Sequence, residues 1–354
     1  MSRMKFEDRK FTWKKDTDIK EEFLSKLKPS TARTVRNILL KVDEYESEIN
    51  KSVYDFNIEE RDDFFISKFN NKSKDVIRTT KSPIVQYINY CIDAHLVKHM
   101  ENRFALISND DIELYTNVQA MEMKYLSREE IETAQDKLVN YCDKLILQLM
   151  PFIRGRTEKN NTNEELTNLR VIDAEEAQKT KSLRVWNNDG DYRYISLDEK
   201  TLYLLKKTIE AKEYIINNGK NYNRKRPDKE LKMGIGEKAF PFSDTGYVFR
   251  VSGGAKQGKV KPTFFNARIN TIKDWVGNPY LTPTNLYFSG MIEYAKQLKE
   301  EKGSELDKMD YIKISRKFEY GKPRILDNGE EDWSVVIAKI KSKVEDYFKL
   351  KGHE

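Results

Sequence analysis

Apolar residues at helical spacing, separated by short polar turns, constrain the fold of this chain more than any other feature. Four such segments occur in about 75 residues of the first third, which predicts an independent helical domain. Asn57 and Glu60 have the spacing of a capping box, and Ser82-Pro83 places proline where a helix starts. The expected helices span about 31–48, after an N-cap at Ser30, then 58–69, a segment opening at Lys72, and 84–100.

The rest of the chain mixes helices with a little β-structure. Ser127 and Glu130 form a second capping box, from which a helix is expected to run to about Met150. Two β-like runs, 182–186 and 192–197, flank a turn of Asn, Asp and Gly, which predicts a hairpin. The remaining expected elements are helices at about 198–217, 263–276, 283–302, 306–319 and 333–350, and a small hairpin at 246–251.

These patterns predict a mainly α fold with a small β-sheet (α+β) in two domains. At 354 residues two domains are the natural expectation, here a helical domain over 1–110 and a second domain over 120–354. Hydrophobic residues make up 38% and charged residues 34%, which is typical of a folded chain with a polar surface. The net charge of +6 permits nucleic-acid binding, but 58 acidic residues oppose 64 basic ones, so a basic surface must be a local patch.

Several classes of protein are disfavoured by what the sequence lacks. Cys91 and Cys142 stand in apolar helical contexts without a CxxC or Cys/His cluster, so we expect reduced thiols, no metal and no cofactor. No run approaches the ~18 apolar residues of a membrane span. The N-terminus has no apolar segment of the kind that a signal peptide needs. We therefore expect a cytoplasmic protein without a membrane partner.

Five short motifs stand in the order in which the tyrosine recombinases, or phage integrases, carry them. From about Ser30 to Phe348 the chain resembles this family, and the resemblance implies a two-domain clamp around duplex DNA. It implies a SAM-like core-binding domain first and a catalytic-like domain second. The motifs are Leu126-Ser-x-x-Glu-Ile131, Gly155-Arg156, Glu165-Leu-x-x-Leu169, Arg193-x-Ile-x-Leu197 and Leu281-Thr-Pro-Thr-Asn-Leu-Tyr-Phe-Ser-Gly-Met-Ile292.

The chemistry of that family requires residues that this sequence lacks. The resemblance implies a tyrosine nucleophile, two phosphate-holding arginines, a hairpin lysine and histidines. Arg156 matches the first arginine, but the hairpin lysine falls at Asn188, where the turn supplies none. Thr284 and Tyr287 replace a histidine and the second arginine, and Tyr320 fits either the nucleophile or the later His/Trp position. Because losing one phosphate clamp costs ~10²–10³ in rate, we expect no catalysis.

Basic and polar side chains in both domains are candidate DNA contacts. Lysine and arginine suit phosphates, whereas asparagine and arginine suit base edges. Each group could equally be a solvated face, and this alternative stays open at this point. The candidates are Arg33, Arg36, Lys72, Lys74, Arg78 and Lys81 in the first domain, and Arg154, Arg156, Lys256, Lys259, Lys261, Asn266, Arg268 and Asn270 in the second.

A DNA-binding fold without cutting chemistry favours a transcription regulator. Because the family that the chain resembles is typical of phages and other mobile elements, the resemblance further implies a repressor of prophage lytic genes. In this respect the chain is similar to the recombinase-like master repressors of SPβ-group Bacillus phages. We expect it to bind a double-stranded operator as a monomer or weak oligomer at the bacterial nucleoid, with a small protein or peptide antagonist as a further partner. The alternatives are an active recombinase with a rebuilt site, using Arg156, Tyr320 and lysines within 220–261, and an accessory or architectural subunit of an integration–excision complex.

Overall fold

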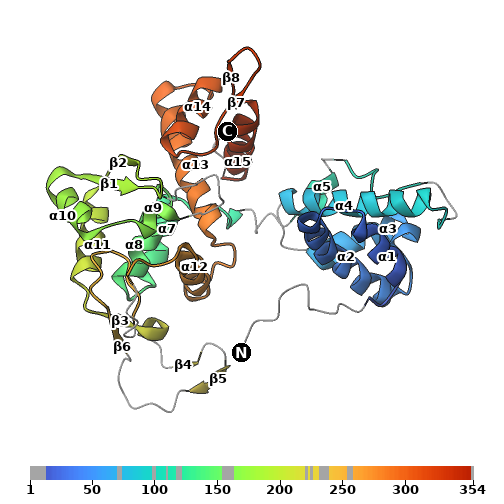
Figure 1. Ribbon diagram of the computed structural model, residues 1–354, viewed down its shortest axis with the longest axis horizontal. Coiled ribbons are helices and arrows are strands. Elements are labelled where there is room, and N and C mark those ends of the chain that lie inside the picture. The colour runs from blue at the N-terminus through green and yellow to red at the C-terminus, as the bar shows by residue number, and fades with distance from the viewer. Residues whose placement is uncertain are drawn as a thin grey trace. The chain divides into compact units, whose positions relative to one another are not determined.

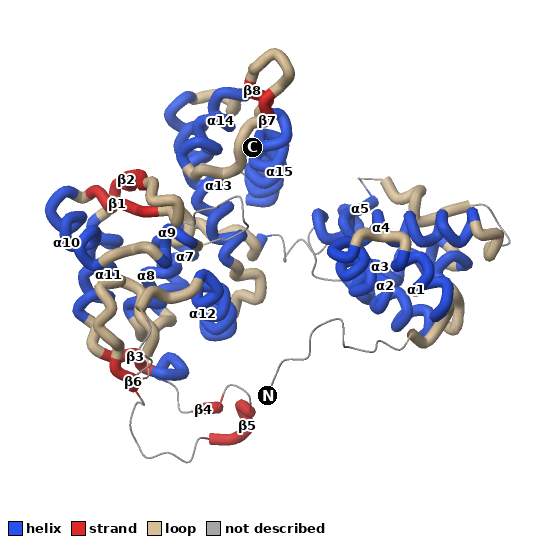
Figure 2. The backbone as a smooth tube through the Cα atoms, in the orientation of Figure 1, coloured by secondary structure: helices blue, strands red, loops and turns tan. Residues whose placement is uncertain are grey.

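The chain folds into two compact units, one within residues 1–121 and the other within 122–354. Both are built mainly of helices, and the strands form short antiparallel pairs (Figures 1 and 2). The expected fold class, mainly α with a little β-structure, is confirmed. The computed structural model describes residues 13–69, 74–97, 101–108, 111–116, 122–153, 163–219, 222–223, 226–230, 239–252 and 258–351.

The first unit is helical and has its own core. Phe64 and Phe65 are fully buried against residues of the other helices. The predicted capping box is confirmed, since the Asn57 amide donates to Glu60 at 2.7 Å and the Glu60 amide donates to Asn57 at 2.8 Å. Its described elements are α1 (Thr17–Ser25), α2 (Pro29–Ile49), η2 (Val53–Asp55), α3 (Ile58–Phe69), α4 (Lys74–Asp93) and α5 (Asp111–Leu114).

Two helix boundaries in this unit differ from expectation. Helix α2 begins at Pro29, with Lys28 rather than Ser30 as its N-cap. The expectation of two helices around Ser82-Pro83 was wrong, because α4 runs through Pro83 without interruption and ends at Asp93. Core packing explains the continuity, since Ile77, Ile84 and Tyr87 are all fully buried along one face of the helix. This packing outweighs the hydrogen bond that proline removes.

A buried charge cluster joins α1 to α2. The Lys20 ammonium donates to Asp43 at 2.7 Å and to Glu46 at 2.6 Å, and the Lys20 and Glu46 side chains are inaccessible to water. The backbone amides of Lys14 and Lys15 also donate to Asp43. The cluster therefore fixes the segment before α1 as well as the helix itself.

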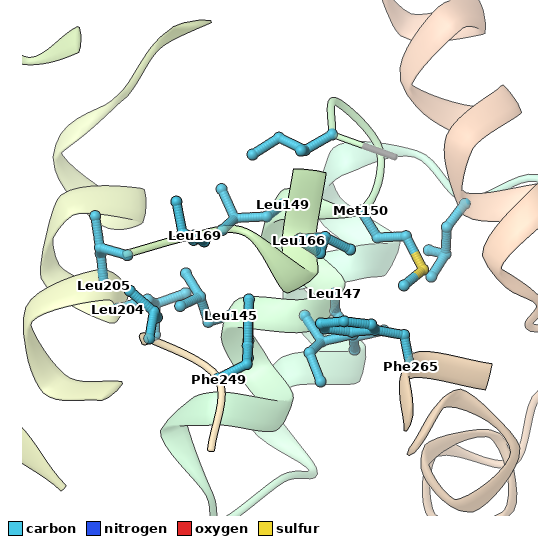
Figure 3. Packing of buried hydrophobic residues seen from close by; sticks show 14 of the residues in the cluster. Leu145, Leu147, Leu149, Met150, Leu166, Leu169, Leu204, Leu205, Phe249 and Phe265 are labelled. Carbon is cyan, nitrogen blue, oxygen red and sulfur yellow. The ribbon is translucent and has the colours of Figure 1, made fainter. Parts of the chain in front are cut away.

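The second unit surrounds one helix that is buried on nearly every side. Figure 3 shows Leu145, Leu147 and Leu149 of α8 within this packing, together with Leu166 and Phe265. The buried polar residues of α8 are hydrogen-bonded, Asp143 with Arg268 and Gln148 with Thr201, so the helix can lie inside the core. The elements up to the second sheet are α7 (Arg128–Asp136), α8 (Tyr141–Leu149), α9 (Glu164–Thr167), α10 (Val171–Thr180), β1 (Ser182–Trp186), β2 (Tyr192–Ser196), α11 (Glu199–Glu210), β3 (Glu213–Ile215), η3 (Ile216–Gly219), β4 (Tyr222–Asn223), β5 (Arg226–Glu230) and β6 (Ala239–Pro241).

The Ser127 capping box is confirmed, but the long helix expected after it was wrong. The helix is interrupted between α7 and α8. At this interruption, side-chain hydrogen bonds join residues 139 and 140 to the segment 215–218. Asn140 accepts a hydrogen bond from the Ile215 amide at 2.8 Å and donates to the Ile215 carbonyl at 2.8 Å. Asn218 accepts from the Val139 amide at 2.7 Å. These contacts replace the backbone hydrogen bonds of a continuous helix.

The predicted hairpin of β1 and β2 is confirmed, and its two faces differ. Leu183 and Val185 are buried, whereas Tyr192 and Tyr194 are exposed. Residues alternate between faces along a strand, so one face packs on the core. The second hairpin expected at 246–251 was wrong; isolated bridges at Tyr247 and Ser252 occur there, and the additional strand pairs are β3–β6 and β4–β5.

The C-terminal helices have a separate core that includes Tyr125. Three of them, α13, α14 and α15, pack on one another, with the short β7–β8 pair between the last two. Among the helices in the described part of the chain, none is long and apolar enough to cross a membrane. The bounds are α12 (Pro262–Val276), α13 (Pro283–Lys302), α14 (Lys308–Lys317), β7 (Arg324–Ile325), β8 (Glu331–Asp332) and α15 (Ser334–Lys351).

Candidate nucleic-acid interface

The start of α13 carries two of the positions at which the sequence departs from the recombinase pattern. Thr282 caps the helix by accepting from the Asn285 amide, and Pro283 occupies its first turn. Thr284, next along, is exposed. Tyr287 is 5% exposed and its hydroxyl donates to the carbonyl of Phe318, whose ring it meets edge-on at 5.8 Å. Tyr287 is thus a core residue of the C-terminal helices.

Helix α13 lies very close to the turn that follows α8. A Cβ atom on Gly290 would lie 2.1 Å from the Pro151 carbonyl oxygen, so only glycine permits this approach. The contact holds the chain immediately before the segment that contains Arg154 and Arg156. Those two candidates lie outside the described residues.

Tyr320 lies just after α14, in a tight backbone turn. Its amide donates to the Ser315 carbonyl at 2.9 Å, and the Ser315 hydroxyl donates to the Tyr320 carbonyl at 2.7 Å. The Tyr320 ring is half-buried and packs on Phe288 at 5.3 Å. Packing on Phe288 therefore helps to position this ring.

An ion pair between half-buried Arg193 and buried Glu165 lies where the hairpin meets the C-terminal helices. Arg193 of β2 donates to both carboxylate oxygens of Glu165, at 2.7 and 2.9 Å. It also donates to the carbonyls of Phe152 at 3.1 Å and Lys317 at 3.0 Å. Burial disfavours the charged guanidinium, but the hydrogen bonds that it donates to Glu165 and the negative charge of that carboxylate outweigh burial and raise the pKa of Arg193. Both residues stand in the motifs quoted above, yet their pairing was not predicted.

The hairpin turn meets a lysine from a distant segment. Asn188 lies in this turn, and the ammonium of Lys259 lies 3.3 Å from its side-chain oxygen. Lys259 also donates to Asn168, at the end of α9. The turn itself contains no lysine, as the sequence indicates, but a lysine ammonium is nevertheless present beside it. The sequence indicated Lys259 and Asn188 separately and did not indicate Asn168. No pattern of neighbouring residues predicts a contact between segments that are so far apart in the chain.

Helix α12 divides the remaining candidates of the second unit between surface and interior. Lys261, just before its first residue, and Asn266 and Asn270 within it are exposed. Arg268 instead donates to both carboxylate oxygens of buried Asp143, at 2.7 and 2.6 Å. Burial raises the pKa of Asp143, while the nearby Arg268 favours its charged form. The guanidinium of Arg268 therefore pairs with a carboxylate of the protein itself. Lys256 lies outside the described residues.

The candidates of the first unit are likewise divided. Arg36 forms an ion pair with Glu21 at 2.8 Å, Lys74 forms one with Glu113, and Lys81 donates to the Ile107 carbonyl. Arg33 on α2 and Arg78 on α4 are exposed, and Lys72 lies outside the described residues. No group of three potential metal ligands occurs in the described parts of either unit.

Comparisons with known proteins agree with this division into units. The family model described as "MrpR, C-terminal catalytic domain" matches residues 125–338, and "MrpR, N-terminal core-binding domain" matches residues 15–93. The chain is 25% identical over 291 residues to the SPbeta prophage-derived uncharacterized protein YopR of Bacillus subtilis (strain 168), covering 81% of this chain and 83% of that protein. The crystal structure of XerA recombinase covers 95% of this chain and 98% of that chain, at 13% identity and a TM-score of 0.37.

Proposed function

The chain belongs to the recombinase-like MrpR family, and we propose that it is a sequence-specific DNA-binding transcription regulator that does not cut DNA. It is a phage-related protein, given its prophage relative. In this role it represses lytic genes of a prophage by occupying a duplex operator as a monomer or weak oligomer. A small protein or peptide antagonist would relieve the repression.

One observation carries the proposed loss of cleavage. Tyr287 stands where the recombinase pattern has its second phosphate-holding arginine, and its ring is packed in the core with the hydroxyl bound to Phe318. A neutral, buried phenol supplies no positive charge to a phosphate in the transition state. Because Thr284 also replaces a histidine, two groups that act on the same phosphate are missing. Losing several such groups removes useful catalysis.

DNA binding does not need those groups, and exposed polar residues support it. We propose that Lys261 contacts a phosphate and that Asn266 and Asn270 face base edges, since their side chains are exposed on α12. In the first unit we retain Arg33 and Arg78, which are exposed. Arg154, Arg156, Lys72 and Lys256 remain candidates from the sequence, whereas Arg268 and Arg36 are engaged in ion pairs.

The test is one incubation of the full chain with fragmented host and phage DNA, divided between a native and a denaturing gel. Selective retention of a few fragments on the native gel, with no covalent adduct and no shortened strands on the denaturing gel, is the expected result. A detergent-resistant adduct that disappears in Tyr320→Phe would establish an active recombinase instead. Absence of retention until other phage proteins are added would favour an accessory subunit.

Two variants then separate specificity from general affinity. Asn270→Ala should lose selectivity among the retained fragments, because a mismatched base contact typically costs ~1–3 kcal/mol. Tyr320→Phe should bind like the unmodified protein, since the hydroxyl has no role in occupying DNA. Equal selectivity in Asn270→Ala and the unmodified chain would refute base readout by α12.

A further inference from the structure

Three segments that are far apart in the sequence hold a single ammonium group. Lys259 precedes α12, Asn168 ends α9, and Asn188 lies in the hairpin turn. The Lys259 ammonium donates to the side-chain oxygens of both asparagines, at 3.3 Å for Asn188. The Asn168 amide donates to Asn188 at 3.1 Å and to the Trp186 carbonyl at 3.0 Å. The two asparagines are therefore fixed to each other as well as to the lysine.

The positive charge of the Lys259 ammonium is not neutralised by the two groups that accept its hydrogen bonds. Both of its hydrogen-bond partners are neutral amides, and within the described ranges no carboxylate forms an ion pair with it. Loss of surrounding water lowers the pKa of Lys259, although the Glu164 carboxylate acts in the opposite sense. An ammonium has three protons to donate, and the asparagines accept two. One N–H donor and the positive charge of the ammonium thus remain. A ligand from outside the protein can reach them because Lys259 is exposed.

The two acceptors are held by rigid parts of the fold. The side chain of Asn187 accepts from the amides of Asp189 at 3.0 Å and Asp191 at 2.9 Å, which tightens the hairpin turn beside Asn188. Asn168 is fixed through its bond to Trp186 on β1. A lysine held in this way has already lost side-chain freedom before any ligand binds. Binding an anion therefore costs this lysine less side-chain entropy than it costs an ordinary surface lysine.

We propose that Lys259, Asn168 and Asn188 form a site for one phosphate group of duplex DNA. Lys259 contacts the phosphate, and the two asparagines are positioning residues that act through it. The ligand follows from chemistry, since a compact, oriented ammonium binds phosphate as a point charge. Lys261, exposed two residues further along the chain, extends the same positive segment toward α12. This inference rests on the proposed function, because it assigns one contact within the proposed DNA interface.

The experiment measures affinity for a fluorescent duplex of random sequence as salt rises from about 50 to about 200 mM. Each phosphate contact contributes about 0.9 to the slope of log K against log salt, so Lys259→Gln should lower that slope by about 0.9. The affinity ratio of unmodified to variant protein should therefore shrink about 3.5-fold across the series. Lys259→Arg, which preserves the charge, should retain more of the slope than Lys259→Gln.

Two further variants test the positioning role and the background. Asn188→Asp places a carboxylate beside the ammonium, so it should neutralise Lys259 and reproduce the slope change while Lys259 is still present. Lys341→Gln on α15 is the matched control; that lysine pairs with Glu345 at 3.5 Å, and its loss should leave the slope unchanged. Thermal melting of each variant reports whether it is folded.

The outcomes separate this inference from the proposed function. If the unmodified chain binds no duplex at any salt, the proposed function itself fails. If it binds with a steep slope that Lys259→Gln and Asn188→Asp leave unchanged, DNA binding stands and the phosphate site is refuted. If only Asn188→Asp leaves the slope unchanged, Lys259 is a contact but the asparagine is not a positioning residue.

Discussion

Replacing Gly290 by alanine tests how α13 is seated on the second unit. Glycine inside a helix normally costs ~1 kcal/mol relative to alanine, so the substitution would stabilise an ordinary exposed helix. Here the new Cβ would lie 2.1 Å from the Pro151 carbonyl oxygen, 2.7 Å from the carbonyl carbon and 3.0 Å from the Pro151 Cβ. Favourable contacts between such atoms need about 3.5 Å, so helix and turn must separate by about 1 Å.

The separation is costly because both sides are backbone and the surroundings are packed. Ser289 and Met291, which flank the glycine, are buried, and Ser289 also accepts a hydrogen bond from the Leu126 amide at 2.9 Å. Overpacking typically costs ~1–3 kcal/mol and occasionally more. With rigid atoms on both sides we expect the upper end, and a net loss of about 2 kcal/mol after the helix propensity gain.

Differential scanning calorimetry of the full chain provides the assay. A loss of about 2 kcal/mol should lower the Tm of the unit within 122–354 by about 4–8 °C. The transition of the first unit is the internal reference and should not move. Gly258→Ala is the matched control, because no atom lies within 4 Å of a Cβ at that position. A Tm for Gly290→Ala that equals or exceeds that of the unmodified chain would refute the close-approach argument.

Three further predictions concern other contacts. Lys20→Met leaves two buried carboxylates without their cation and should destabilise the first unit by ~3–5 kcal/mol in urea unfolding; a loss below ~1 kcal/mol would contradict the role of this cluster. Tyr287→Phe retains the packed ring but leaves the Phe318 carbonyl without this donor, so calorimetry should show a loss of about 1–2 kcal/mol, with DNA affinity unchanged. The hydrogen bond from Lys302 lowers the pKa of Asp307 from its ordinary 3.8 to about 2, which stabilises the fold above pH 3.8 and is lost as pH falls toward 2. Asp307→Asn should therefore lose less Tm than the unmodified chain over this interval, and parallel curves would exclude the effect.

Local sequence signals predicted the helix starts best. The Asn57–Glu60 and Ser127–Glu130 capping boxes form at helix starts as expected. Each signal acts through hydrogen bonds between residues three apart, so neighbouring residues are sufficient to form it. The β1–β2 hairpin was predictable for the same reason, because its turn residues and alternating strands are adjacent in the chain.

Elements that depend on distant partners were not predictable in this way. Helix α4 passes Pro83 because its apolar face is buried, and the break before α8 exists because Asn140 and Asn218 bridge segments about 75 residues apart. The pattern of a single sequence contains the preferences of a segment, but not the identity of the surface against which it will pack.

The same distinction applies to the candidate interface. The sequence by itself determined the mainly helical class, the capping boxes at Asn57 and Ser127 and the absence of an arginine at Tyr287. Only the tertiary structure decided that Arg268 is bound to Asp143 and that Lys259 lies beside Asn188. The physical reason is the separation in sequence over which each interaction acts. Helix caps and turns involve residues only a few positions apart. Whether a charged side chain is neutralised or can bind a ligand depends instead on groups that folding brings together from distant segments.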